Sequence, residues 1–301
     1  MIYTIGETVL DIILKNMKPR AVKAGGSALN TAVSLAQLGS SVRFISEIGN
    51  DEPGAFILDF LSQNNVDCRY IQTHVSCKTP LAMAFLNEQN DATYQFYKEL
   101  PDTVHFPRIS MNKHDIVLFS SSYAIAQRNR AALISILHAA KQNKSLCVYD
   151  PNMRKSMSRN GVEYDFFCEN LSYASIVRAS DEDCVNIFGT NNGADVYSKV
   201  KKYGVSVLVL TQNKSEVEVY APHFVSSYEV PEIIPVSTIG AGDTFNAGII
   251  HCLQQRKNQD YMSRTFWDTA IPFAISCSAV VCRSYENYVT SADVTNLQSL
   301  I

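Results

Sequence analysis

Four consecutive residues near the C-terminal end of the chain combine two features that phosphate chemistry needs. Gly240, Ala241 and Gly242 have small side chains or none, and a helix-like apolar segment follows them. The first N–H groups of a helix lack intrahelical partners and carry roughly half a positive charge, so a phosphate could approach them closely here. Asp243 would stand beside that phosphate as the base for an attacking hydroxyl. An acid at a helix start can also simply cap the helix, and this segment alone leaves both interpretations open.

A second pair of glycines, Gly25 and Gly26, also precedes a helix-like pattern, which ends at Gly39. Asn30 lies one turn into that helix, and its amide can both donate and accept, which suits the recognition of hydroxyl groups. Asp11 interrupts an apolar run, where an unpaired acid is costly to bury. It therefore either faces solvent on a half-exposed strand or lines a polar cavity.

Three further polar side chains follow an apolar, strand-like segment. They are Asp150, Asn152 and Arg154. In open α/β sheets, ligands bind beyond the carboxyl ends of the strands, which is where these side chains would lie. A simple turn built on Asp-Pro-Asn explains the same residues equally well.

The elements that must position these residues alternate along the chain. Strand-like segments occur at 2–5, 42–46, 116–119, 146–149, 176–177, 205–210 and 217–220, and helix-like ones at 28–38, 53–64, 130–141 and 195–202. This alternation predicts a single α/β domain over residues 1–301, with a mostly parallel sheet and helices on both faces. Residues 265–282 also have helical periodicity, and we expect Pro272 to split them into two helices.

Residues 79–98 break the alternation. Two strand-like runs flank the polar segment 87–91, which predicts a hairpin, although a helix over 81–85 is an alternative. Together with residues 11–24, this insertion (about 79–100) would form a small separate sheet. We expect it to act as a lid over a cleft, and its exposed apolar faces could also pair with a second subunit as a homodimer.

Composition narrows the class of ligand. Hydrophobic residues make up 46% of the 301, charged residues 18%, and the formal net charge is −3. No run of Lys and Arg exceeds two residues, so we expect a small-molecule ligand and neither a nucleic acid nor a membrane. The eight cysteines form no C-x-x-C pair and no signal-peptide pattern opens the chain, which favours a cytoplasmic protein with reduced thiols. No P-loop, dinucleotide or serine-hydrolase motif occurs.

The two segments in which glycines precede a helix resemble a known family when they are considered together. Residues 25–30 (GGSALN) and 240–245 (GAGDTF) resemble the N-terminal and C-terminal signatures of the ribokinase-like (PfkB) family of sugar kinases. The resemblance covers essentially the whole chain in order. It implies the three-layer ribokinase-like fold with a small β-sheet lid, and transfer of the γ-phosphate of ATP to a free sugar with the help of Mg²⁺.

The resemblance also implies roles for individual residues. Asp243 would be the catalytic base, beside an anion hole formed by Gly240, Ala241 and Gly242. The residues implied to bind the sugar are Asp11, Gly25, Gly26, Asn30 and Arg154. Those implied to bind the nucleotide are Asp150, Asn152, Ser180, Asp183, Thr211, Asn213 and Gly242, with Asp183 also reaching Mg²⁺ through water.

Three segments depart from the family's pattern. Ser237 replaces an acid that often belongs to a monovalent-cation site. Ser180 and Asp183 replace the Asn and Glu of a four-residue motif, and Glu216 replaces the second glycine of the nucleotide loop. Fructose is the leading acceptor, because residues 150–154 match a motif of the fructokinase-like branches. The alternatives are ribose, a 2-keto-3-deoxy sugar acid or a nucleoside as substrate, or a sugar-binding protein without transfer activity.

Overall fold

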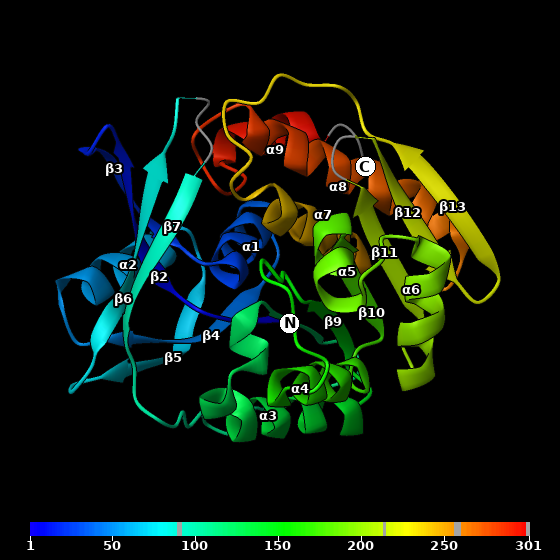
Figure 1. The fold of residues 1–301 in the computed structure, drawn as a ribbon, viewed down its shortest axis with the longest axis horizontal. Helices are drawn as coiled ribbons and strands as arrows, with labels where there is room; N and C mark the ends of the chain where they lie inside the picture. Colours follow the sequence, from blue (N-terminus) through cyan, green and yellow to red (C-terminus); the bar gives the residue numbers. More distant parts are fainter. Residues whose placement is uncertain (89–91, 213–214, 256–259, 299–301) are drawn as a thin grey trace.

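A nine-stranded sheet forms the centre of the protein (Figure 1). The computed structural model describes residues 1–88, 92–212, 215–255 and 260–298. The strand order is β13-β12-β11-β10-β9-β8-β1-β4-β5; neighbours from β11 to β5 run parallel, and the pairs β11–β12 and β12–β13 are antiparallel. The strands are β1 (Ile2–Ile5), β4 (Val42–Gly49), β5 (Asp67–His74), β8 (Ile116–Ser120), β9 (Leu146–Asp150), β10 (Ile176–Ser180), β11 (Val207–Gln212), β12 (Glu216–Ala221) and β13 (Phe224–Glu229).

Helices cover both faces of this sheet, which confirms the three-layer α/β prediction. One face carries α1 (Ser27–Gln37), α2 (Glu52–Gln63), α7 (Ala241–Gln255), α8 (Arg264–Cys282) and α9 (Ser291–Gln298), and the other carries α3 (Arg130–Gln142), α4 (Val162–Leu171), α5 (Asp181–Phe188) and α6 (Gly193–Val200). Three short 3₁₀ turns occupy Ser122–Ile125, Gln127–Asn129 and Lys201–Tyr203.

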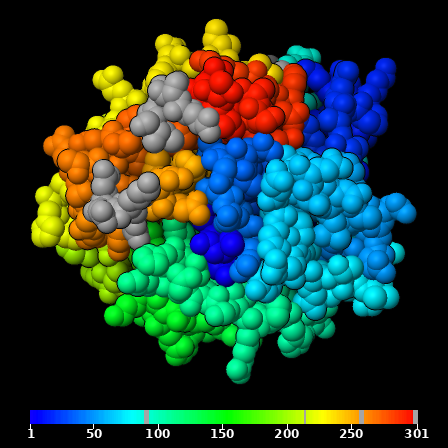
Figure 2. All heavy atoms as spheres, turned by 180° about the vertical axis from the view of Figure 1, so that it is seen from behind, coloured from blue at the N-terminus to red at the C-terminus, as the bar shows by residue number. Residues whose placement is uncertain are grey.

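The strands are apolar at successive positions because both of their faces are buried. In β1, Ile2 belongs to the core under α1 and α7, whereas Tyr3 and Ile5 point into the core under α3 and α4. Seen from the opposite side, the first residues (dark blue) reach the surface between the blue, green and orange segments (Figure 2). This position agrees with a first strand that lies inside the sheet, between β4 and β8.

A separate four-stranded sheet lies at the left of Figure 1. Its order is β3-β2-β6-β7, with β2 (Val9–Lys15), β3 (Lys18–Gly25), β6 (Lys78–Leu86) and β7 (Ala92–Glu99). β6 and β7 form the predicted hairpin, so the helical alternative for 81–85 is wrong. β2 pairs with β3 antiparallel and with β6 parallel, so the sheet joins the two insertions as the sequence predicted.

The predicted break at Pro272 is wrong, because α8 continues unbroken through it. The proline ring removes the bond to the carbonyl of Asp268, at a cost of about 3 kcal/mol. Both residues lie on the exposed side of the helix, where water can bond that carbonyl. The opposite side buries Phe266, Trp267 and Phe273, each worth about 1.5–3 kcal/mol, and this burial outweighs the lost bond.

Among the described helices, α8 is the one that is long and apolar enough to cross a membrane. Burial inside the protein covers 56% of that stretch, and its single tryptophan, Trp267, has no exposed surface. The helix packs along α7 as part of the core. Its apolar composition is therefore explained by burial within the fold.

Candidate active site

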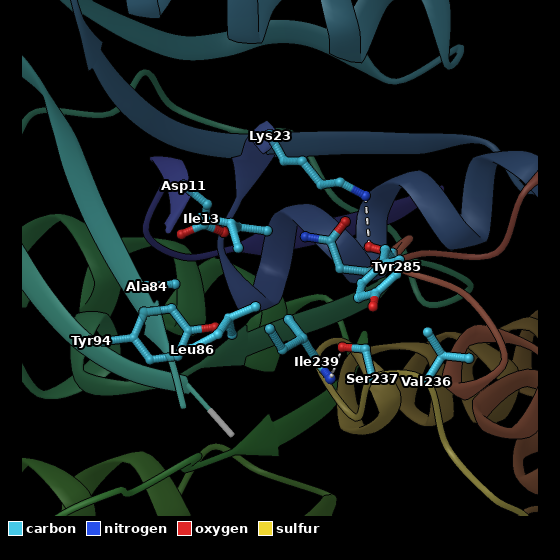
Figure 3. A pocket seen from close by; sticks show the side chains of 11 residues that line it. Asp11, Ile13, Lys23, Ala84, Leu86, Tyr94, Val236, Ser237, Ile239 and Tyr285 are labelled. Atoms are coloured by element: carbon cyan, nitrogen blue, oxygen red, sulfur yellow. Dashed lines mark hydrogen bonds between the residues drawn. The ribbon is translucent and has the colours of Figure 1, made fainter. Parts of the chain in front are cut away.

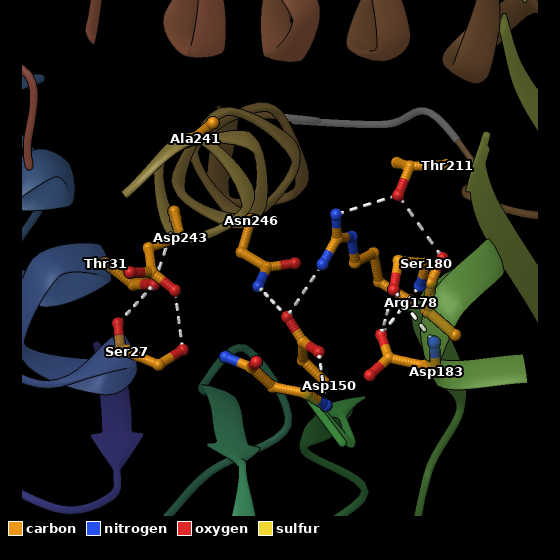
Figure 4. A network of polar contacts seen from close by, with 12 residues as sticks. Ser27, Thr31, Asp150, Arg178, Ser180, Asp183, Thr211, Ala241, Asp243 and Asn246 are labelled. Carbon is orange, nitrogen blue, oxygen red and sulfur yellow. Dashed lines mark hydrogen bonds and ion pairs between the residues drawn. The ribbon is translucent and has the colours of Figure 1, made fainter. Parts of the chain in front are cut away.

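Asp243 lies where the N-terminal and C-terminal signatures meet. It is the third residue of α7, and its carboxylate accepts one bond from Ser27 Oγ at 2.6 Å (Figure 4). It accepts another from Asn30 Nδ2 at 2.8 Å. Both donors stand on α1, which packs against α7. The carboxylate thus bonds side chains of another helix, and the capping interpretation is wrong. Burial raises the pKa of Asp243, although the bonds from Ser27 and Asn30 oppose the shift.

The turn before Asp243 exposes backbone donors. Gly240 has φ +84°, and a Cβ on it would lie 2.2 Å from the carbonyl oxygen of Asn287, so only glycine fits there. The N–H of Ala241 donates to the carbonyl oxygen of Thr238 at 3.3 Å. The N–H groups of Gly242 and Asp243 have no acceptor among the described residues. These two amides, and not that of Ala241, are therefore free to bind an anion.

The N-terminal glycines allow another close approach. Gly26 has φ +126° and precedes α1 directly, and a Cβ on it would lie 2.2 Å from the carbonyl oxygen of Glu7. A Cβ on Gly25 would lie 2.0 Å from Oδ2 of Asp11. Asn30 is buried, and its Oδ1 has no partner within the described chain. Asp11 and this amide oxygen therefore remain available for hydroxyl groups.

Asp11 lines a pocket between the small sheet and the loops that flank α7 and α8 (Figure 3). The pocket encloses about 30 Å³. Its other lining residues are Ile13, Lys23, Ala84, Leu86, Tyr94, Val236, Ser237, Ile239, Tyr285 and Asn287. Burial raises the pKa of Asp11 to about 7, while the nearby charge of Arg154 opposes the shift. The guanidinium of Arg154 lies over the ring of Tyr94, 5.3 Å from its centroid, so this site residue also reaches the small sheet.

Asp150 ends β9 and is fully buried. Its Oδ1 accepts the N–H of Asn152 at 3.0 Å, and its Oδ2 accepts Asn246 Nδ2 at 2.5 Å and Arg178 Nη1 at 3.3 Å. Burial raises the pKa of Asp150 to about 6, and Arg178 opposes the shift. Asn152 has φ +42°, and its bond to Oδ1 together with the bond from Asn246 on α7 to Oδ2 holds the carboxylate facing α7.

Ser180 and Asp183 form a capping box at the start of α5. Ser180 N–H and Oγ donate to Asp183 Oδ2 at 2.8 and 2.7 Å, and the N–H of Met153 donates to Oδ1. No group of three His, Cys, Asp or Glu in the described part of the chain could hold a metal. Mg²⁺ commonly keeps its waters and uses one or two carboxylates plus phosphate oxygens. Asp150 and Asp183 fit an ion held in that way.

Three residues of the network were not among the predicted ones. Ser27 and Asn246 bond Asp243 and Asp150, and Arg178 bonds both Asp150 and Thr211 (Figure 4). Two of them could have been found from the sequence. Asn246 stands three residues after Asp243, and Arg178 is a charged residue inside an apolar strand. Thr211 bonds Arg178 in this network, whereas Asn213 falls outside the described residues.

The fold and this site define a kinase of the ribokinase-like class, and a comparison with family models agrees. The model of the pfkB family of carbohydrate kinases matches residues 1–291. The chain belongs to this family, and it is a phosphotransferase that acts on an alcohol group of a carbohydrate.

Its relatives are fructokinases at modest identity. A fructokinase from Klebsiella pneumoniae is 25% identical over 289 residues, which cover 93% of this chain and 92% of the relative. Fructokinase-1 from Oryza sativa is 26% identical over 273 residues, covering 87% and 83%.

Solved structures share the fold. Fructokinase from Vibrio cholerae O395, bound to fructose, ADP and calcium, superposes with a TM-score of 0.86 at 20% identity, covering 99% of this chain and 98% of that one. Aminoimidazole riboside kinase from Salmonella enterica, bound to its riboside and an ATP analogue, gives 0.85 at 18% identity, covering 98% and 99%.

The raised pKa of Asp11 leads to a prediction about stability and binding. The folded pKa of about 7 lies above the unfolded value of about 3.9. The stability that its protonation contributes is complete below about pH 4 and is lost as the pH rises through 7. Asp11→Asn cannot ionise, so it should melt above the wild type at pH 8 and lose this advantage gradually as the pH falls from 7 to about 4. Its KM for the acceptor should rise about tenfold to a hundredfold, as for a lost bond to a charged group. Melting curves at several pH values and a KM measurement check both effects. A melting difference that does not change with pH would contradict the assignment.

Proposed function

We propose that this carbohydrate kinase transfers the γ-phosphate of ATP to a hydroxymethyl group of a free sugar, with fructose as the leading acceptor. The observation that carries the proposal is the bonding of Asp243 to Ser27 and Asn30. These bonds hold the carboxylate of Asp243 and the free N–H groups at the start of α7 next to the amide of Asn30, which can bind a hydroxyl group. The names of the relatives and the Asp-Pro-Asn-x-Arg motif at 150–154 support fructose.

In this proposal, the sugar's hydroxyls bond Asp11 and Oδ1 of Asn30, which places one hydroxyl beside Asp243. Asp243 removes the proton of that hydroxyl as its oxygen attacks the γ-phosphorus. The free N–H groups of Gly242 and Asp243 bond the phosphate oxygens, where charge develops. Positioning and charge stabilisation are the main requirements of phosphoryl transfer. When bound near Asp150 and Asp183, Mg²⁺ would neutralise part of the phosphate charge.

The small sheet would act as a lid in the same proposal. About 30 Å³ beside Asp11 is room for one or two waters and not for a sugar. The ammonium of Lys23 on β3 bonds the carbonyl oxygen of Tyr285 at 2.6 Å and the carboxylate of Glu286 at 3.0 Å, which ties the sheet to the opposite wall. Acceptor entry would therefore need the sheet to move outward and this tie to open.

A nucleoside is the second candidate acceptor. Most of the pocket's lining is apolar or aromatic, including Ile13, Leu86, Tyr94 and Ile239. A heterocyclic base would bury more apolar surface against these side chains than a free sugar could. One neighbouring structure is a kinase of a riboside, which supports this alternative.

ADP release from Mg-ATP, measured with free sugars, sugar acids and nucleosides, tests the proposal. Turnover with fructose supports the leading acceptor, and turnover with a nucleoside alone replaces it. If no acceptor supports turnover while a sugar still raises the melting temperature, the protein binds sugar without transferring phosphate. We also propose a cytoplasmic location, where ATP and free sugars are available.

The outer face of the small sheet supports a homodimer as a further part of the proposal. The strand register puts Ile12, Val22, Met83, Phe85 and Tyr97 on the face opposite Asp11, and all five are exposed or half-exposed. Such a contiguous apolar face favours pairing with a second copy. We expect sedimentation as a dimer that Val22→Asp converts to a monomer. Val225, a similarly exposed valine on β13, is the control, and Val225→Asp should leave the dimer intact. A monomeric wild type would contradict the pairing.

A further inference from the structure

A buried guanidinium lies next to the free amides of α7. Arg178 stands on β10 with 9% of its surface exposed. Its Nη1 donates to Asp150 at 3.3 Å and its Nη2 donates to Thr211 Oγ1 at 2.8 Å (Figure 4). The guanidinium also lies over the ring of Phe245, 5.7 Å from its centroid. These contacts fix the orientation of the side chain before any ligand binds.

The guanidinium touches the first turn of α7. A Cβ on Gly242 would lie 3.1 Å from Nη1 and 3.3 Å from Nη2 of Arg178, so the glycine leaves room for the charged group. Gly242 and Asp243 are the residues whose N–H groups have no acceptor in the described chain. Two kinds of group that can bind an anion, the free N–H groups of the helix and the guanidinium of Arg178, therefore lie next to each other.

The charges around Arg178 do not balance. Asp150 and Asp183 are both buried, and Asp243 faces the same network from the start of α7 (Figure 4). A triphosphate would add further negative charge beside these three carboxylates. A fixed guanidinium offsets that repulsion, and its planar donors match phosphate oxygens better than an ammonium does.

The network around Arg178 also contains unused polar atoms. Nε of Arg178 and Oδ1 of Asn246 are buried and have no partner in the described part of the protein. Asn246 is 1% exposed. Buried polar groups are normally bonded, so these two atoms still have a bond to offer to a polar ligand.

We propose that Arg178 is a catalytic residue that bonds the transferred phosphate, an inference that rests on the proposed kinase function. As the acceptor oxygen forms its bond to the γ-phosphorus, the bond from this phosphorus to the bridging oxygen breaks, and ADP leaves with the electron pair. Asp243 takes the hydroxyl proton. Arg178 keeps its protons throughout and stabilises the negative charge on the phosphate oxygens.

The difference between two nucleotides tests this contact without any turnover. Calorimetry with Mg²⁺ and either ADP or the non-hydrolysable ATP analogue AMPPNP isolates the phosphate that is transferred. Arg178→Gln should weaken AMPPNP binding by about tenfold to a hundredfold, the range for a bond to a charged group, and ADP binding by less than about threefold. The matched control is Arg130→Gln, since Arg130 is equally buried and bonds Glu169 and Asn170 away from the site. It should leave the ratio of the two affinities unchanged.

Each other outcome is decisive. Equal losses for both nucleotides would show that Arg178 only positions Asp150 and Thr211, and no loss would remove it from the site; either result overturns the inference but leaves the kinase proposal intact. If the wild type binds neither nucleotide, both proposals fail. If Arg178→Gln does not fold, Arg178→Lys serves as a second variant, because it keeps the charge but lacks the planar guanidinium donors. The ratio of its AMPPNP affinity to its ADP affinity should be at least threefold lower than in the wild type. An unchanged ratio would overturn the inference.

Discussion

Replacing Asp243 by asparagine should lower kcat by about 10²- to 10⁴-fold, the usual contribution of a general base, with little change in the binding of acceptor and nucleotide. The amide has nearly the shape of the carboxylate but cannot take the hydroxyl proton. Its oxygen can accept from Ser27 or from Asn30, but its NH₂ group then faces the other donor. Steady-state kinetics with separate binding measurements distinguishes lost chemistry from lost affinity.

The pH profile provides an independent check on Asp243. Burial raises its pKa, so the wild-type kcat should fall on the acidic side as the base becomes protonated, and the asparagine variant should lack this fall. Asp268→Asn is the control, because this exposed acid on α8 bonds Tyr228 far from the base. An Asp243→Asn enzyme that keeps full kcat would show that another group accepts the proton.

Replacing Gly240 by alanine should reduce kcat by at least about 10²-fold and lower the melting temperature. The residue has φ +84°, which costs a non-glycine residue about 1–2 kcal/mol. The new Cβ would also lie 2.2 Å from the carbonyl oxygen of Asn287, so the backbone must move, and the free amides of Gly242 and Asp243 move with it. A misplacement of about 1 Å at a reacting centre can cost 10²-fold in rate.

Gly39 provides a matched control for this substitution. Its φ is +86°, but a Cβ on it would meet no atom within 4 Å. Gly39→Ala should therefore show only the loss of stability that comes from backbone strain, with normal kcat. Melting curves and kcat for the two variants separate strain from displacement. If both variants lose equal stability and keep their activity, the close contact at Gly240 does not hold the α7 start in place.

The sequence predicted the alternation and the small sheet well because these depend on local patterns. Buried strands such as β8 and β9 are continuous apolar runs, and the polar segment between β6 and β7 marks a hairpin. Helices α4, α5 and α9 were missed. α5 is short and begins with three acidic residues, so its apolar pattern is weak. Ser180 and Asp183 were therefore assigned only to nucleotide binding, and their role as a capping box for this helix was not recognised.

Contacts between distant segments could not be predicted from local patterns. Asp243 can be proposed as a base from its glycine neighbours, but its bond to Ser27 depends on how α1 packs against α7. Arg178 could have been noticed as a charge in a strand, yet its partners lie on β9 and β11. The effect of Pro272 depended on which side of α8 faces solvent. In each case tertiary placement determined the result.

The pairing of Asp243 with Asn30 has a consequence for the newly made chain. The two residues are 213 positions apart, and at roughly 5–20 residues per second the ribosome needs on the order of 10–40 s to go from one to the other. During that interval α1 is complete but its partner helix does not exist. Phosphoryl transfer therefore begins only after nearly the whole polypeptide has been synthesised, and truncated translation products should be inactive.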